Sequence, residues 1–341
     1  MRSMAGGQWQ MADGRWQMAN GGGRVCHWPF AISYLLFAMA FGPGCTSAKP
    51  PATAPPAVSM AGRAAAQAAK LSQNQHWSAA AREWRLAADD FALLNDRARE
   101  AIALHNLAQA QRELGQLEDA RRLLEQAATL NEKFERTNEW WRNQIALLQL
   151  EAQSGQTNSL NARFEQLASP SSRLKDRSLR GLFLNELGLW ELRQHHLTKA
   201  ERAFLQAEEQ FQAVHDAPGI ATLLANRAQL YEEQKDFPAA INAWRLALSK
   251  FEALADPPGI TRALAGQGRA LLEAQKDLPL SEDLLRQAAR NFRTLQAQSD
   301  LEVTLELLVQ CLNAQGKSEE TRSVRSELQK LSEKRAPQTG P

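Results

Sequence analysis

The sequence predicts an all-α protein, a solenoid of about seven two-helix repeats of 40 residues. Ala, Leu, Gln, Glu and Arg dominate the composition, and their side chains lose little rotamer freedom in a helix. A bulky residue recurs at spacings of 40, 40, 40, 40, 41 and 40, through Trp84, Leu124, Phe164, Phe204, Trp244, Leu285 and, in the last unit, Arg325. In most units a small residue stands four before it and another three after it, which places all three on one helical face.

Charge and cysteine content exclude several classes of protein. The 341 residues carry 40 Lys and Arg against 38 Asp and Glu, so no nucleic-acid partner is indicated. The three cysteines, Cys26, Cys45 and Cys311, form neither a disulfide framework nor a metal cluster. There is no phosphate-binding glycine loop and no nucleophile elbow. We expect no enzymatic activity, no catalytic residues, no cofactor, no metal and no small-molecule substrate.

Residues 1–44 are interpreted as a leader and signal peptide. Residues 7–20 repeat a seven-residue unit, GQWQMAD then GRWQMAN, which indicates either a disordered leader or an over-extended translation start. The apolar run from Trp28 to Phe41 is shorter than the roughly 20 residues that a membrane span needs. Lying behind Arg24, it is typical of a secretory signal core, and a buried core helix is the alternative.

Cys45 follows this run directly, and the arrangement resembles the lipobox of bacterial lipoproteins. Gly44 matches the small residue before the lipidated cysteine, whereas Gly42 and Pro43 depart from the usual Leu and Ala or Ser. Residues 45–59 form a proline-rich, semi-rigid tether. The resemblance implies a lipid at Cys45 and, because Thr46 is not Asp, an outer-membrane lipoprotein that faces the periplasm of a Gram-negative cell.

The repeats at 60–332 resemble the tetratricopeptide repeat (TPR) family. Unit four carries its motif as Leu184, Leu187, Gly188, Ala200, Phe204 and Ala207, and unit five as Tyr231, Ala240, Trp244 and Ala247. Pro238 and Pro279 are expected at the start of second helices, where a missing N–H costs nothing. Unit three lacks the small residues. Arg325 gives the last unit the polar character of a solenoid cap, and residues 333–341 are predicted to be a disordered tail.

The resemblance implies a right-handed superhelix whose first helices line a concave groove for a protein or peptide partner. Polar groove residues are carried over in units two to five, and amides among them suit main-chain recognition because each both donates and accepts. They are His105, Asn106, Gln109, Arg112, Arg142, Gln149, Asn185, Arg193, Asn226, Gln229 and Glu232. The alternative for each is a solvated helix face.

We therefore predict a non-catalytic scaffold or adaptor, lipid-anchored in the cell envelope, that holds a protein or peptide partner in its groove. The alternative is a soluble cytoplasmic TPR regulatory or co-chaperone protein whose N-terminal leader is wrongly assigned. Trp140 and Trp141 open unit three and are either exposed interface anchors or packed against the preceding unit.

Overall fold

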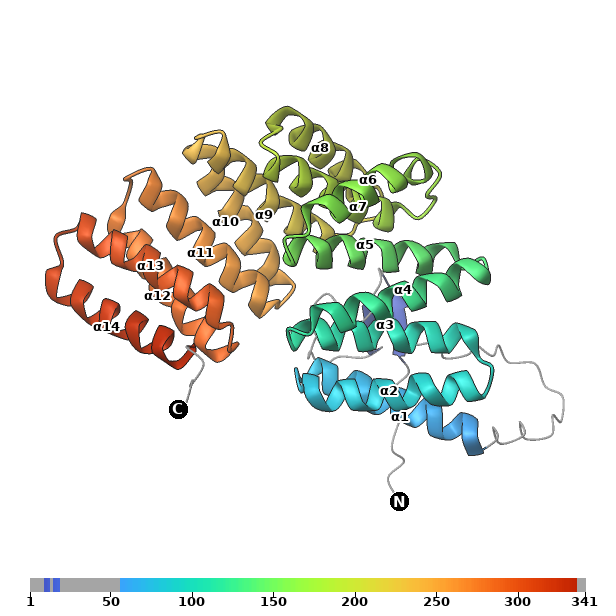
Figure 1. Cartoon of the computed structure of the whole chain (residues 1–341). Helices are drawn as coiled ribbons and strands as arrows, with labels where there is room; N and C mark the ends of the chain where they lie inside the picture. The colour runs from blue at the N-terminus through green and yellow to red at the C-terminus, as the bar shows by residue number, and fades with distance from the viewer. Residues whose placement is uncertain (1–8, 13–14, 19–55, 336–341) are drawn as a thin grey trace, which may run out of the picture.

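The structure, a computed structural model, describes residues 9–12, 15–18 and 56–335, which form fourteen helices and two short strands. The helices are α1 (Pro56–Gln73), α2 (Trp77–Leu93), α3 (Arg97–Glu113), α4 (Leu117–Lys133), α5 (Thr137–Gln153), α6 (Thr157–Ser171), α7 (Arg177–Arg193), α8 (Leu197–Ala213), α9 (Ala217–Glu233), α10 (Phe237–Ala253), α11 (Pro257–Glu273), α12 (Leu278–Thr294), α13 (Gln298–Ala314) and α14 (Ser318–Arg335). They pair as seven two-helix units along one curved row (Figure 1), which confirms the predicted α-solenoid.

Helix and linker lengths explain the 40-residue period. Most helices have 17 residues, and three-residue linkers join them, so that two helices and two linkers make one unit. The single spacing of 41 arises between α11 and α12, where residues 274–277 form a four-residue linker. The repeat is therefore longer than the usual TPR because its helices are longer.

Every linker except residues 172–176, between α6 and α7, ends its helix through the same left-handed backbone turn. Asn95 adopts a left-handed conformation with φ 55°, and the N–H of Asp96 donates to the carbonyl of Phe91 at 2.9 Å. This is a Schellman turn, which satisfies the last carbonyls of the helix. The Asp96 side chain then accepts from the N–H of Arg99 and caps α3. Prolines such as Pro238 stand inside the first turn of the following helix, as expected.

The bulky residue of each unit is buried where the sequence placed it. Phe204, Trp244 and Leu285 are at most 1% exposed, and Ala240 and Ala247 beside Trp244 are fully buried. The small residues allow the two helices of a unit to approach closely, and the bulky side chain fills the space between them. Arg325 in the last unit is exposed, because no further unit covers α14.

Unit three packs differently from the others. Helices α5 and α6 lie close together over only a short part of their length. In every other unit the two helices stay close over a longer part. Leu148, Leu160 and Leu167 are buried at positions where most other units have Ala, Gly or Ser, so their volume holds α6 away from α5. Trp141 is buried, and Trp140 packs against the same apolar cluster, whose residues come from units three and four. The prediction that the two tryptophans pack against the preceding unit is therefore wrong, because their neighbours lie in their own unit and in the following one, as with Trp141 and Phe183.

Both ends of the predicted solenoid need correction. Helix α1 begins at Pro56, inside the predicted tether 45–59, because proline is accepted in the first turn of a helix. Helix α14 continues to Arg335, inside the predicted disordered tail 333–341. Cys45, the Trp28–Phe41 run and residues 336–341 lie outside the described residues.

The leader holds two strands that we did not anticipate, β1 (Trp9–Ala12) and β2 (Arg15–Met18). They pair antiparallel, with Trp9 opposite Met18 and Met11 opposite Trp16.

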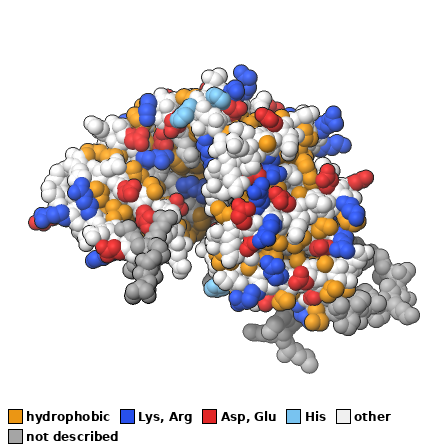
Figure 2. Space-filling view, viewed as in Figure 1, with side chains coloured by type: hydrophobic (Ala, Val, Ile, Leu, Met, Phe, Trp, Pro, Cys, Tyr) orange, Lys and Arg blue, Asp and Glu red, His pale blue; other side chains and the backbone are white. Residues whose placement is uncertain are grey.

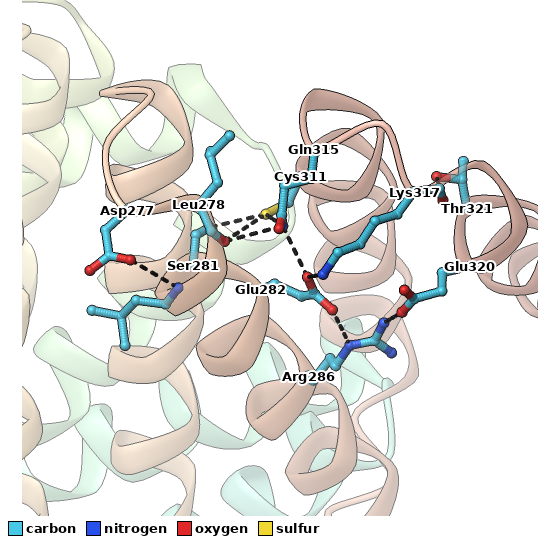
Figure 3. A network of polar contacts seen from close by, with 11 residues as sticks. Asp277, Leu278, Ser281, Glu282, Arg286, Cys311, Gln315, Lys317, Glu320 and Thr321 are labelled. Carbon is cyan, nitrogen blue, oxygen red and sulfur yellow. Dashed lines mark hydrogen bonds and ion pairs between the residues drawn. The ribbon is translucent and has the colours of Figure 1, made fainter.

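A polar cluster fastens the last unit to the one before it (Figure 3). The Glu282 carboxylate accepts from Lys317 at 2.6 Å, from Gln315 at 2.9 Å and from Arg286 at 2.9 Å, and Arg286 also pairs with Glu320. Burial opposes ionisation of Glu282, but these donors together hold its pKa below the ordinary value. The terminal unit thus replaces the missing apolar neighbour with charge-assisted hydrogen bonds.

The row of units bends into an arch, with α1–α4 in one arm and α11–α14 in the other (Figure 1). Figure 2 shows a hollow between the arms, with Lys or Arg side chains visible inside it. Among the helices that the structure describes, none is both long enough and apolar enough to cross a membrane.

Candidate binding groove

The first helices of the units form the inner face of the arch. Successive first helices α5, α7, α9, α11 and α13 approach one another, whereas no comparable approach joins successive second helices among the described elements. Curvature brings the inner elements of a solenoid closer together than the outer ones, so the first helices lie inside. This is the arrangement that the sequence predicted for the groove.

All eleven predicted groove residues lie on first helices, but their exposure differs. The half-buried ones are His105, Asn106, Gln109, Arg112, Arg142, Gln149 and Gln229. Asn185, Asn226 and Glu232 are buried, and Arg193 is exposed at the end of α7. Direct contact between these residues and a partner stays a prediction.

A ladder of polar side chains runs along the inner face from α3 to α7. The Arg112 guanidinium on α3 donates to the Gln149 side chain on α5 at 3.5 Å, and Gln149 donates to Glu186 on α7 at 2.9 Å. Burial raises the pKa of Glu186, and the bond from Gln149 and the nearby Arg193 and Arg112 offset only part of this effect. The ladder ties three successive units together with groups that also face the groove.

Three of the predicted groove residues are used between helices. Asn226 donates to Asn185 at 2.9 Å, which joins α9 to α7. Glu232 accepts from the Trp244 indole at 2.9 Å and from the Arg269 guanidinium at 2.5 Å. Burial raises the pKa of Glu232, and Arg269 counteracts it. We therefore correct their placement: these side chains lie beneath the groove surface and hold neighbouring helices, because burial obliges polar groups to find partners.

Two residues of this network, Glu186 and Arg269, were not predicted from the sequence, although the 40-residue spacing points to both. Glu186 stands 80 residues after Asn106 and 40 before Asn226, so the register of those two residues selects Glu186 in unit four, whereas the prediction took its neighbour Asn185. Arg269 likewise stands 40 residues after Gln229. Strict use of the 40-residue register would have found both.

His105 lies near one end of the groove, between α3 and α5. Its Nδ1 donates to the Asn143 side-chain oxygen at 2.7 Å. Burial lowers the pKa of His105, and Arg112 adds to this, while the bond to Asn143 opposes it. Burial also lowers the pKa of Arg142 on the same face, against the effect of Asp176. The inner face therefore offers neutral imidazole, amides and guanidinium groups within a partly desolvated surface.

Comparisons with known proteins agree with this architecture. The family model described as tetratricopeptide repeat matches residues 180–253, which are units four and five. The sequence motif of those two units is thus confirmed. No curated protein sequence matches the chain.

Several solved structures are similar to the chain in fold. The apo form of the quorum sensor NprR from B. thuringiensis is 10% identical with a TM-score of 0.64, covering 81% of this chain and 77% of that one. Aspartyl phosphate phosphatase F from Bacillus subtilis is 12% identical with a TM-score of 0.63, covering 81% and 71%. A Rap protein complexed with Competence and Sporulation Factor is 12% identical with a TM-score of 0.53, covering 79% and 75%. At these identities the likeness shows the fold alone.

Proposed function

We propose that this chain, whose repeats belong to the tetratricopeptide-repeat family, is a non-catalytic scaffold that holds a protein or peptide segment in its concave groove. The observation that carries the proposal is the polar inner face, where Gln149 and Glu186 bridge successive first helices. Amide and carboxylate groups spaced one helix apart suit the regularly spaced main-chain groups of an extended segment.

The solved structures of similar fold support a binding role. One of them is a Rap protein complexed with Competence and Sporulation Factor, and another is named a quorum sensor. A third is named a phosphatase, but at 12% identity its likeness extends to the fold and not to catalytic residues. We carry over a binding role only, and neither the binding face nor the identity of any ligand.

Photo-cross-linking tests the groove. A cross-linking residue at Gln229, half-buried on the inner face, should capture a specific protein in the native cell. The matched control places it at Leu205 on the second helix α8, which is 50% exposed. Capture of the same proteins from both positions, or from neither, would remove the support for a groove partner.

We further propose that the chain is a lipoprotein of the cell envelope, anchored through Cys45. The supporting observations are the apolar run, the cysteine that follows it and the proline-rich tether. In a Gram-negative cell we expect it on the periplasmic side of the outer membrane. Wild-type protein should then sediment with membranes, and Cys45→Ser should move to the soluble fraction. Equal distribution of both proteins would reject the anchor and favour the cytoplasmic alternative.

A further inference from the structure

One position of the second helix is a buried Phe in most units but not in unit two. At the 40-residue register it is Phe91, Asn131, Ser171, Phe211, Phe251 and, one residue later, Phe292. The four Phe side chains are at most 7% exposed. The Phe211 ring, for example, lies against residues 181 and 219 on the first helices of its own unit and of the next. Asn131 is smaller than this ring, so unit two has space to spare.

The spare space is a pocket between α3, α4 and α5. Ala101 and Glu139, which stand 80 residues before 181 and 219, both line it together with Asn131. Asn106 and Arg142, which also line it, are predicted groove residues. The space accessible to a water-sized group is about 20 Å³, which is enough for one small polar group.

Two buried side chains that line this pocket each carry a polar atom with no hydrogen-bond partner among the described residues. These atoms are the Asn131 Oδ1 and the Asn143 Nδ2, on side chains 3% and 1% exposed. The bond from His105 to the Asn143 oxygen at 2.7 Å fixes that amide with its NH₂ group free. A buried donor or acceptor without a hydrogen-bond partner lowers stability by about 1–3 kcal/mol. A bound group that pairs with these two atoms would remove that cost.

We propose that the pocket receives the hydroxyl group of a Ser or Thr side chain from the partner segment in the groove. A hydroxyl oxygen can accept from the Asn143 Nδ2 and donate to the Asn131 Oδ1 at the same time. An anionic phosphate or carboxylate accepts without donating, so it would leave the Asn131 Oδ1 unpaired and would lie near the Glu139 carboxylate. These two costs oppose the attraction of Arg142, which also lines the pocket. This inference rests on the proposed function, because it names the partner chemistry at one point of the groove.

A peptide selection on the full chain tests the pocket. A phage-displayed library of random peptides is selected against the purified protein, and the enriched peptides are aligned. We expect one shared Ser or Thr. Replacing that residue with Val or Ala in a synthetic peptide should weaken binding about tenfold, because two neutral hydrogen bonds are lost. A phosphorylated form of the same peptide should bind more weakly still.

Two protein variants make the test specific. Asn131→Phe restores the residue of the other units and should abolish the preference for Ser or Thr while retaining a cooperative thermal transition. Leu205→Ala, on the second helix α8 and 50% exposed, should keep the preference. Enriched peptides without a shared hydroxyl, or with a shared Asn or Gln, would overturn the pocket assignment and leave the groove function standing. Absence of any enriched peptide would overturn both.

Discussion

Replacement of Gly266 by Ala tests the packing of the solenoid most sharply. Gly266 lies in α11, and a Cβ built there would stand 2.4 Å from Cε2 and 2.6 Å from Cδ2 of the Trp244 ring. Carbon atoms at rest keep about 3.5–4.0 Å apart, so the ring or the helix must move by about 1 Å. The Trp244 ring is 1% exposed, and its indole N–H donates to Glu232 at 2.9 Å. The ring therefore cannot shift without disturbing its packing or this hydrogen bond.

The size of the effect follows from two opposing contributions. Overpacking of a filled core costs about 1–3 kcal/mol. Ala is favoured over Gly inside a helix by about 1 kcal/mol, which offsets part of that cost. We expect Gly266→Ala to lower the free energy of unfolding by up to about 2 kcal/mol, and to be about 1–3 kcal/mol less stable than a Gly→Ala change without a clash. Gly62→Ala is the matched control, because no atom lies within 4 Å of a Cβ at that helical position, and it should be stabilising.

Urea denaturation followed by circular dichroism measures the free energy, and hydrogen exchange locates the change. Because each unit contacts only its neighbours, faster exchange should be concentrated in α10 and α11. If Gly266→Ala is as stable as Gly62→Ala, the close approach of Gly266 to Trp244 is wrong, and the assigned packing of units five and six fails with it.

Three further substitutions test the buried charges and the register. Ala240→Leu should lower the free energy of unfolding by about 1–3 kcal/mol in urea denaturation, because Ala240 is fully buried beside Trp244. An unchanged midpoint would reject the register. Glu282→Gln should lower the melting temperature at pH 7. The lowered pKa of Glu282 means that its stabilisation is lost as pH falls, so wild type and variant should converge in acid. A constant difference across pH would reject this. Glu186→Gln should do the opposite and raise the melting temperature at pH 7. The raised pKa of Glu186 makes its carboxylate unfavourable above its ordinary pKa, and the difference should vanish below it. Destabilisation by this variant at pH 7 would show that the ladder needs the charge.

The bulky and small positions of the fold could be predicted because packing repeats. Trp84, Phe204 and Trp244 stand at one position of the register, and each is buried as that position requires. The polar positions were harder. Asn185 and Glu186 are neighbours in sequence, and one is buried against Asn226 while the other faces the groove ladder. Consecutive residues of an α-helix point about 100° apart around its axis. The sequence does not show which of the two neighbours points toward the groove and which points toward the adjacent helix.

The ends of the solenoid were also harder to predict than its middle. Pro56 lies in the predicted tether, yet it is the first residue of α1. Proline occurs both in extended tethers and in the first turn of a helix, so the residue type does not distinguish the two. Unit three has leucines in place of small residues, but only the structure shows that α6 stands away from α5 as a result.

The sequence by itself determined the number of units, their 40-residue period and which helix faces are apolar. These properties repeat along the chain, and helix geometry converts spacing into a face. The tertiary structure decided which polar side chains face the groove and which hold helices together, as with Glu232 between Trp244 and Arg269. It also decided that Asn131 opens a pocket, because the pocket is made by residues of three helices, and their meeting is a property of packing and not of spacing.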